Sequence, residues 1–134
     1  MSKLEQIIKK LCILVVDDME SIRSIVNSRL KGLGAEQIVM VGNGESAWDT
    51  LKSRQIDLII SDWDMPELTG LELLGRVRNS EPHSHIPFLL LSGEVAKEKV
   101  VSAFDAGVDD YLVKPFKPKE LEFRVIKMLA KVKL

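Results

Sequence analysis

The sequence predicts an α/β fold, a five-stranded parallel sheet that is doubly wound as (βα)5 in a single domain. Two observations support this class. The chain has 134 residues, of which 46% are apolar, and this suits one compact domain with a substantial core. Short apolar runs alternate along the chain with stretches of helical periodicity, an alternation that is typical of βαβ units with right-handed crossovers.

Five apolar runs are long enough for a buried strand and too short for a helix. The first begins at Cys12, which we expect to be buried as a small hydrophobic side chain. The predicted strands are 12–16, 38–41, 58–60, 88–91 and 111–113.

Each predicted strand is followed by a predicted helix. Asn43 is the expected N-cap of the second helix, and Pro118 suits the first position of the fifth. The first helix has the clearest apolar stripe, which ends near Gly34 and consists of Ile22, Ile25, Val26, Leu30 and Leu33. The other stripes are Ala47, Trp48 and Leu51; Leu71, Leu74 and Val77 after Gly70; Val100, Val101, Ala103 and Phe104 before Gly107; and Leu121, Val125, Met128, Leu129 and Val132.

Residues 1–10 precede the first strand and mix charged with apolar side chains. We expect a short N-terminal lead-in, a turn that packs loosely. The sequence of residues 1–134 contains no low-complexity tract or linker, so we expect one domain over this whole range.

The overall charge excludes several classes of partner. Nineteen Lys and Arg against twenty Asp and Glu leave a net charge of -1, which does not attract a nucleic acid or an anionic membrane. A single cysteine cannot form an internal disulfide, and no apolar run is long enough to span a bilayer. We therefore expect a cytoplasmic protein with neither nucleic acid nor membrane as partner.

Polar residues follow four of the five predicted strands. The carboxyl ends of parallel strands lie at one edge of the sheet, where ligands bind in doubly wound folds. In the flavodoxin-like strand order 2-1-3-4-5, the first and third strands are neighbours, so their carboxylates share one pocket. These residues are Asp17 and Asp18, then Asp62 and Asp64, then Ser92, and finally Lys114.

Three carboxylates in one pocket need either a retained proton or a divalent cation. Oxygen ligands favour Mg²⁺, which also binds phosphoryl groups. Lys114 would supply a positive charge for a phosphoryl oxygen, and Ser92 a hydroxyl donor. Taken singly, Asp17, Asp18 and Ser92 also suit helix caps and Lys114 a surface ion pair. Their joint placement favours a Mg²⁺ and phosphoryl site.

With these residues in place, the sequence resembles the receiver domain of bacterial response regulators, and within that family the stand-alone chemotaxis regulators. The resemblance runs from residue 12 to about residue 131. The order 2-1-3-4-5 is a known property of this family, and the residues alone do not derive it. The motifs that carry it are Val15-Val16-Asp17-Asp18, Ile60-Ser61-Asp62-Trp63-Asp64-Met65-Pro66, Gly70-Leu71-Glu72-Leu73-Leu74, Leu91-Ser92-Gly93-Glu94 and Tyr111-Leu112-Val113-Lys114-Pro115-Phe116.

The resemblance implies a Mg²⁺-dependent phosphoacceptor switch in two-component signal transduction. Asp62 would accept the phosphoryl group from a histidine kinase or a small acyl phosphate. Asp17, Asp18, Asp62 and the backbone carbonyl of Asp64 would bind Mg²⁺. The phosphoryl oxygens of the acyl phosphate would be contacted by Lys114 and Ser92.

The resemblance also implies how the signal would leave the domain. Ser92 and Tyr111 would form the switch, and a protein target would bind the face made by the fourth helix, the fifth strand and the fifth helix. A flagellar motor switch is one expected target, with chemotaxis as the output. The domain would lose its phosphoryl group to water and act as a monomer or a weak dimer, not as an enzyme. The bond between Lys114 and Pro115 would be cis.

Three residues depart from the chemotaxis pattern, and three alternative interpretations fit the sequence. Asp64 stands where the chemotaxis type has an amide, Glu94 stands two residues after Ser92, and Ser92 stands in place of a threonine. We expect Asp64 to alter dephosphorylation and recognition by a dedicated phosphatase. The spacing of Asp62 and Asp64 also fits an aspartate-nucleophile phosphatase of the haloacid dehalogenase type. The others are a binding module that no longer uses phosphate and a receiver domain excised from a larger regulator.

Overall fold

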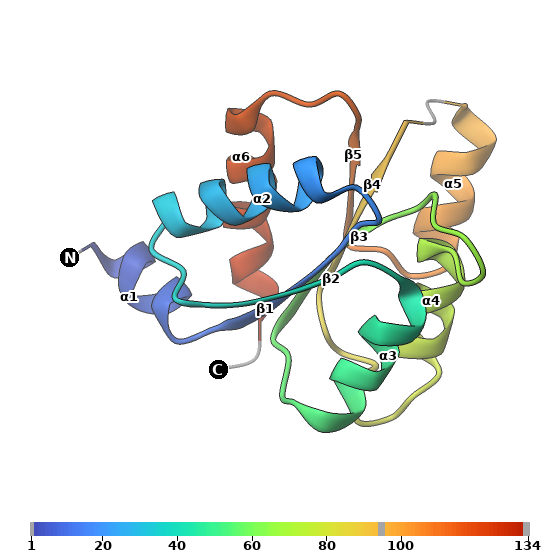
Figure 1. The fold of residues 1–134 in the computed structure, drawn as a ribbon, viewed down its shortest axis with the longest axis horizontal. Helices are drawn as coiled ribbons and strands as arrows, with labels where there is room; N and C mark the ends of the chain where they lie inside the picture. Colours follow the sequence, from blue (N-terminus) through green and yellow to red (C-terminus); the bar gives the residue numbers. More distant parts are fainter. Residues whose placement is uncertain (1, 94–95, 133–134) are drawn as a thin grey trace.

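A computed structural model describes residues 2–93 and 96–132. It contains one parallel five-stranded sheet in the order β2-β1-β3-β4-β5, with helices on both faces (Figure 1). This confirms the predicted flavodoxin-like topology. The elements are α1 (Lys3–Lys9), β1 (Cys12–Val16), α2 (Glu20–Gly32), β2 (Gln37–Val41), α3 (Gly44–Ser53), β3 (Leu58–Asp62), α4 (Gly70–Arg78), β4 (Phe88–Ser92), α5 (Lys97–Asp105), β5 (Asp110–Val113), α6 (Pro118–Met128) and a short 3-10 turn (Leu129–Lys131).

The sheet separates two hydrophobic cores. The helices α3, α4 and α5 cover one face, while α1, α2 and α6 cover the other. Successive side chains of a strand alternate between the two faces, so Leu14 enters the first core and Ile13 and Val15 enter the second. Every residue of β1, β3 and β4 is buried, as expected for central strands of a parallel sheet, whereas β2 forms a partly exposed edge.

The register of the strands brings their carboxyl ends to one edge. Val16 pairs with Ser61, Asp62 pairs with Leu91, and Ser92 pairs with Val113. The residue that follows each of β1 and β5, and the last residue of each of β3 and β4, therefore lie at the same edge. This is the edge at which the sequence places the polar residues.

The N-terminal lead-in is a helix, so the prediction of a loosely packed turn was wrong. Ser2 and Glu5 form a capping box at its start: the Ser2 hydroxyl accepts from the Glu5 amide at 3.1 Å, and the Glu5 carboxylate accepts from the Ser2 amide at 3.3 Å. Ile8 is fully buried in the second core. Gly34 has a φ of 109°, and a Cβ there would lie 3.3 Å from Ile8 Cγ2, so α1 packs closely on the end of α2.

One smaller prediction also needs correction, and one loop histidine is packed against its neighbours. Ile25 belongs to the predicted apolar stripe of α2, yet its side chain is 42% exposed and lines a surface groove instead of the core. His83, in the loop between α4 and β4, is half-buried: its ring bridges the Ser80 hydroxyl at 2.8 Å and the Leu51 carbonyl at 2.9 Å. It also lies edge-on to Trp48, so it is a packing residue.

Three local predictions are confirmed. The Asn43 side chain accepts from the Ser46 amide and caps α3. Cys12 is buried. The bond between Lys114 and Pro115 is cis. Within residues 2–93 and 96–132, no helix has the length and apolar character needed to cross a membrane.

Candidate functional site

A lysine that follows β5 contacts two carboxylates that lie at the ends of β1 and β3. Lys114 Nζ lies 2.9 Å from Asp17 Oδ2 and 3.0 Å from Asp62 Oδ1. Both carboxylates are almost fully buried, and the lysine side chain is 18% exposed. The residues meet because Asp17 follows the end of β1, Asp62 ends β3 and Lys114 follows the end of β5.

Asp18 completes a group of three carboxylates. One oxygen from each of Asp17, Asp18 and Asp62 lies within 4.8 Å of the other two, and Asp18 is the exposed member that faces solvent. Oxygen atoms at such spacing suit a hard divalent cation, and Mg²⁺ commonly binds through one or two carboxylates together with water. The residues present therefore fit a Mg²⁺ site, as the sequence predicted.

Burial and the hydrogen bonds between Lys114 and the carboxylates have opposite effects on the pKa values of Asp62 and Lys114. Burial raises the pKa of Asp62, and the nearby Asp17 carboxylate adds to this, while the hydrogen bond from Lys114 opposes it. Burial alone would lower the pKa of Lys114, but its hydrogen bonds to Asp17 and Asp62 outweigh burial and the pKa is raised. Lys114 therefore stays charged, and Asp62 binds a proton more readily than an ordinary aspartate does.

The backbone that follows Asp62 is held on several sides. The amide of Trp63 donates to the Leu91 carbonyl at 2.8 Å, and the carbonyl of Trp63 accepts from the Gly70 amide at 2.9 Å. Gly70 approaches so closely that a Cβ at this position would overlap the Asp62 carbonyl. The amide of Asp64 donates to Asp62 Oδ1 at 3.3 Å, while the Asp64 side chain is exposed. This loop therefore holds the Asp62 main chain in one place.

The two residues predicted to form a switch occupy different environments. Ser92 is fully buried at the end of β4, and its carbonyl accepts from the Lys114 amide at 2.8 Å, which ties it to the backbone beside the carboxylates. Tyr111 is 7% exposed and lies edge-on to the Trp63 ring, with centroids 6.2 Å apart. Glu94, also predicted near this pocket, lies outside the described residues.

A cation lies over Trp63, and sequence reasoning missed it. Lys99 Nζ, from α5, is 5.2 Å from the centroid of the Trp63 ring. The ring thus contacts β5 through Tyr111 and α5 through Lys99. No sequence pattern marks this pair, because the two residues are 36 positions apart and only the fold brings them together.

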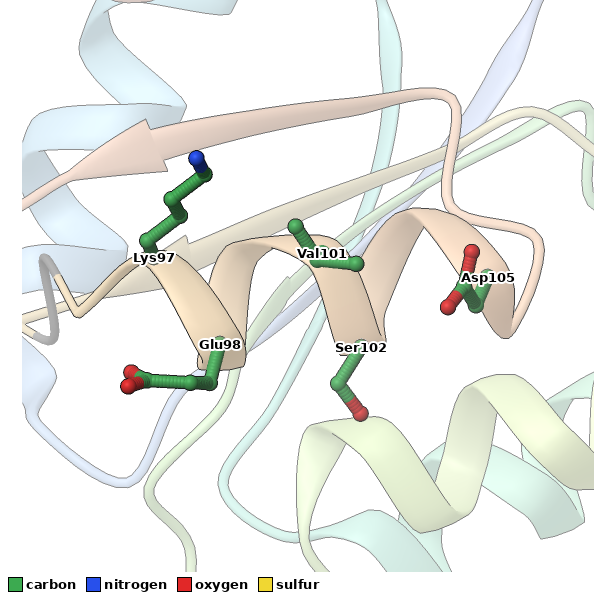
Figure 2. Close-up of a pocket in the computed structure, with 5 residues that line it drawn as sticks. All are labelled: Lys97, Glu98, Val101, Ser102 and Asp105. Carbon is green, nitrogen blue, oxygen red and sulfur yellow. The ribbon is translucent and has the colours of Figure 1, made fainter.

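The outer side of α5 is hollowed into a shallow pocket, and Figure 2 shows the side chains that line it. Val101, which lines this pocket, and Phe104, on the same helix, are each 47% exposed. The sequence placed both in the apolar stripe of this helix, but only part of that stripe reaches the core. The pocket is lined by Lys97, Glu98, Val101, Ser102 and Asp105.

The fold and the pocket of carboxylates together define a class of protein, the flavodoxin-like signalling domains that respond to phosphoryl groups. The chain belongs to the response regulator receiver domain family, whose model matches residues 13–126. Members of this family are signalling switches of two-component systems and not classical enzymes, and they bind Mg²⁺ at an acidic pocket. The predicted resemblance is confirmed, and the phosphatase alternative is not supported.

Individual relatives agree with the family assignment. A CheY homolog of Campylobacter jejuni, a chemotaxis protein, is 37% identical over 119 residues, which cover 88% of this chain and 92% of that protein. The chemotaxis response regulator CheY4 of Vibrio cholerae superimposes with a TM-score of 0.79 at 32% identity, covering 89% of this chain and 98% of that one. The receiver domain of a histidine kinase from Syntrophus aciditrophicus gives 0.84 at 32% identity, with 92% of both chains covered.

Proposed function

We propose that Asp62 is the phosphoacceptor of a Mg²⁺-dependent switch. The observation that carries the proposal is the pair of contacts from Lys114 to Asp17 and Asp62, beside a third carboxylate on Asp18. Asp62 combines a nucleophilic oxygen with a fixed cation at hydrogen-bond distance. Phosphoryl transfer needs little more than positioning and charge neutralisation, and this pocket supplies both.

In this proposal a carboxylate oxygen of Asp62 attacks phosphorus. A new phosphorus-oxygen bond forms as the bond to the donor breaks, and the electron pair leaves with the imidazole of a phosphohistidine or the carboxylate of an acyl phosphate. Lys114 moves from the Asp62 carboxylate to a phosphoryl oxygen, and Ser92 donates its hydroxyl to another. Water later cleaves the same bond, which returns free Asp62 and inorganic phosphate.

Four groups would hold the cation: the carboxylates of Asp17, Asp18 and Asp62 and the backbone carbonyl of Asp64. When bound, Mg²⁺ supplies positive charge that neutralises the phosphoryl oxygens during transfer. The exposed position of Asp18 and Asp64 leaves this side of the pocket open to a phosphodonor. We expect the Asp64 carboxylate to affect dephosphorylation and the recognition of a dedicated phosphatase, because it lies beside the path of the attacking water.

The output would pass through Ser92 and Tyr111 to the face formed by α5, β5 and α6. Phosphorylation adds about -1.5 to -2 charges beside Ser92 and Lys114, and both would move toward the phosphoryl group. On α5 this face includes the exposed apolar side chains of Val101 and Phe104. The similarity to chemotaxis proteins supports a histidine kinase as donor and a protein target such as a flagellar motor switch.

We further propose that residues 1–134 act as one receiver domain in the cytoplasm, as a monomer or a weak dimer. The support is a shared second core that includes Ile8 of α1 and Met128 of α6, near the two ends of the chain. Neither nucleic acid nor a membrane is proposed as partner.

Intact mass spectrometry tests the central proposal directly. The chain is incubated with a small acyl phosphate and Mg²⁺, and we expect a mass gain of one labile phosphoryl group. Asp62→Ala should abolish the gain, whereas Asp49→Ala, which alters an exposed aspartate on α3, should keep it. A gain that survives in Asp62→Ala would refute Asp62 as the phosphoacceptor, and repeated turnover of p-nitrophenyl phosphate would favour a phosphatase instead.

A further inference from the structure

The turn that carries Asp17 and Asp18 is closed by an arginine from the helix that follows it. Arg23 of α2 donates from Nη1 to the main-chain carbonyl of Asp17 over 2.6 Å, in a partly buried hydrogen bond. Asp17 lies just past the end of β1, where its carbonyl needs a partner other than the strand ladder. The guanidinium supplies that partner, and a hydrogen bond from a charged donor is stronger than one from a neutral amide.

Gly42 leaves room for this guanidinium. A Cβ at Gly42 would lie 3.3 Å from Arg23 Nη1, a tight contact that would require the guanidinium to shift by a few tenths of an ångström. Gly42 directly follows Val41, whose carbonyl accepts from the Asp17 amide at 3.2 Å. The Asp17 main chain is thus held by β2 through its amide and by Arg23 through its carbonyl. The absence of a side chain at Gly42 therefore leaves space for the Arg23 guanidinium.

The side chain of Asp17 depends on this main-chain position. Its Oδ1 accepts from the Met19 amide at 2.9 Å, and its Oδ2 contacts Lys114 Nζ at 2.9 Å. Met19 occupies the N-cap of α2 and provides no side-chain cap. The start of α2 is therefore held by the contacts of Asp17. One of these contacts is the hydrogen bond from Arg23 to its carbonyl. A shift of the Asp17 main chain would displace Asp18 as well, since the two are adjacent in sequence.

We propose that Arg23 is a positioning residue for divalent cation binding, because it fixes the main chain from which Asp17 and Asp18 approach Asp62. The inference rests on the proposed Mg²⁺ site and assigns a role to a residue that does not itself contact the cation. Loss of an outer partner of a metal ligand typically weakens metal binding by about 10- to 100-fold. Since Arg23 holds a backbone carbonyl and not a ligand atom, we expect Arg23→Met to weaken Mg²⁺ binding by about 10-fold, the lower end of that range.

The test is Mg²⁺ titration of the full chain by isothermal calorimetry, with thermal unfolding in metal-free buffer as a parallel measurement. Arg29→Met is the matched control, because it removes the same charge from an exposed position on the same helix. Arg23→Lys retains a charged donor and should recover most of the lost affinity. Gly42→Ala leaves the arginine intact but crowds it, so it should weaken Mg²⁺ binding in the same direction.

The outcomes separate this inference from the function on which it rests. Mg²⁺ affinity of Arg23→Met equal to that of Arg29→Met would overturn the inference while leaving the Mg²⁺ site in place. If Arg23→Met does not fold, then unchanged Mg²⁺ affinity in Gly42→Ala, which leaves the arginine in place but crowds it, would overturn the inference. A drop in unfolding temperature without a change in affinity would show a purely structural role and also overturn it. Absence of saturable Mg²⁺ binding by the wild-type chain would refute the proposed function itself.

Discussion

Replacement of Lys114 by methionine removes the cation that separates two buried carboxylates. At the observed distances of 2.9 and 3.0 Å, each ion pair is worth about 5.6 kcal/mol of attraction at an effective dielectric constant near 20. The cost of desolvating the lysine cancels a large part of this. Breaking a buried pair by removing one partner typically costs 3 to 5 kcal/mol, because the remaining charge is left uncompensated. We expect Lys114→Met to lower the free energy of unfolding by about 3 kcal/mol at pH 7 without Mg²⁺.

The loss should depend on pH in a defined direction. Burial already raises the pKa of Asp62, and removal of Lys114 would raise it further because the lysine is the main group that opposes burial. A carboxyl whose folded pKa lies above its unfolded value stabilises the fold while it is protonated, and this stability is lost as the pH rises through the folded pKa. The deficit of Lys114→Met should therefore be smaller at pH 4.5 than at pH 7.

Urea unfolding followed by far-UV circular dichroism measures this directly at both pH values. Lys119→Met serves as the control, because it removes the same charge from an exposed position at the start of α6 and should change the free energy of unfolding by less than about 0.5 kcal/mol. Equal stability of the two variants at pH 7 would refute the reasoning. A deficit that grows on acidification would refute the assignment of the effect to an uncompensated carboxylate.

Two further substitutions and one labelling experiment test the packing. Gly70→Ala should cost at least about 1 to 3 kcal/mol of stability, because its Cβ would overlap the Asp62 carbonyl. Gly75→Ala on the same helix meets nothing within 4 Å and should be neutral or stabilising. Equal melting temperatures of the two variants would contradict the close contact at Gly70. Ile8→Ala should cost about 2 to 5 kcal/mol in urea unfolding, and a cost near zero would mean that α1 does not pack on the core. Burial raises the pKa of the Cys12 thiol, so a thiol reagent should label the native chain slowly and the urea-unfolded chain fast; fast native labelling would contradict its burial.

The sequence alone was sufficient to locate the strands and the polar residues at their carboxyl ends. A fully buried parallel strand shows as a continuous apolar run, and the polar residue that ends the run marks the ligand edge, so Asp17, Asp62, Ser92 and Lys114 were found without coordinates. The strand order came from resemblance, since apolar runs do not encode which strands are neighbours. The contacts between Lys114 and the two aspartates depend on that order, because they join β5 to β1 and β3.

The features that escaped prediction depend on tertiary contacts. The helix α1 has only seven residues, too few to be stable in isolation, and it forms because Ile8 enters a core built by distant segments. Its one local signal was the capping-box spacing of Ser2 and Glu5. Ile25 fits the periodicity of α2 but faces the groove beside Phe116, and periodicity cannot tell a core from a groove. Arg23 gives no signal at all until the end of β1 is seen.

The backbone on either side of the pocket is held by different contacts. Next to Asp62, Trp63 is bonded on both its amide and its carbonyl, and α4 starts with a full capping box between Thr69 and Glu72. By contrast the N-cap of α5 is Ala96, whose side chain provides no capping hydrogen bond. We therefore expect phosphorylation of Asp62 to displace α5 more than α4.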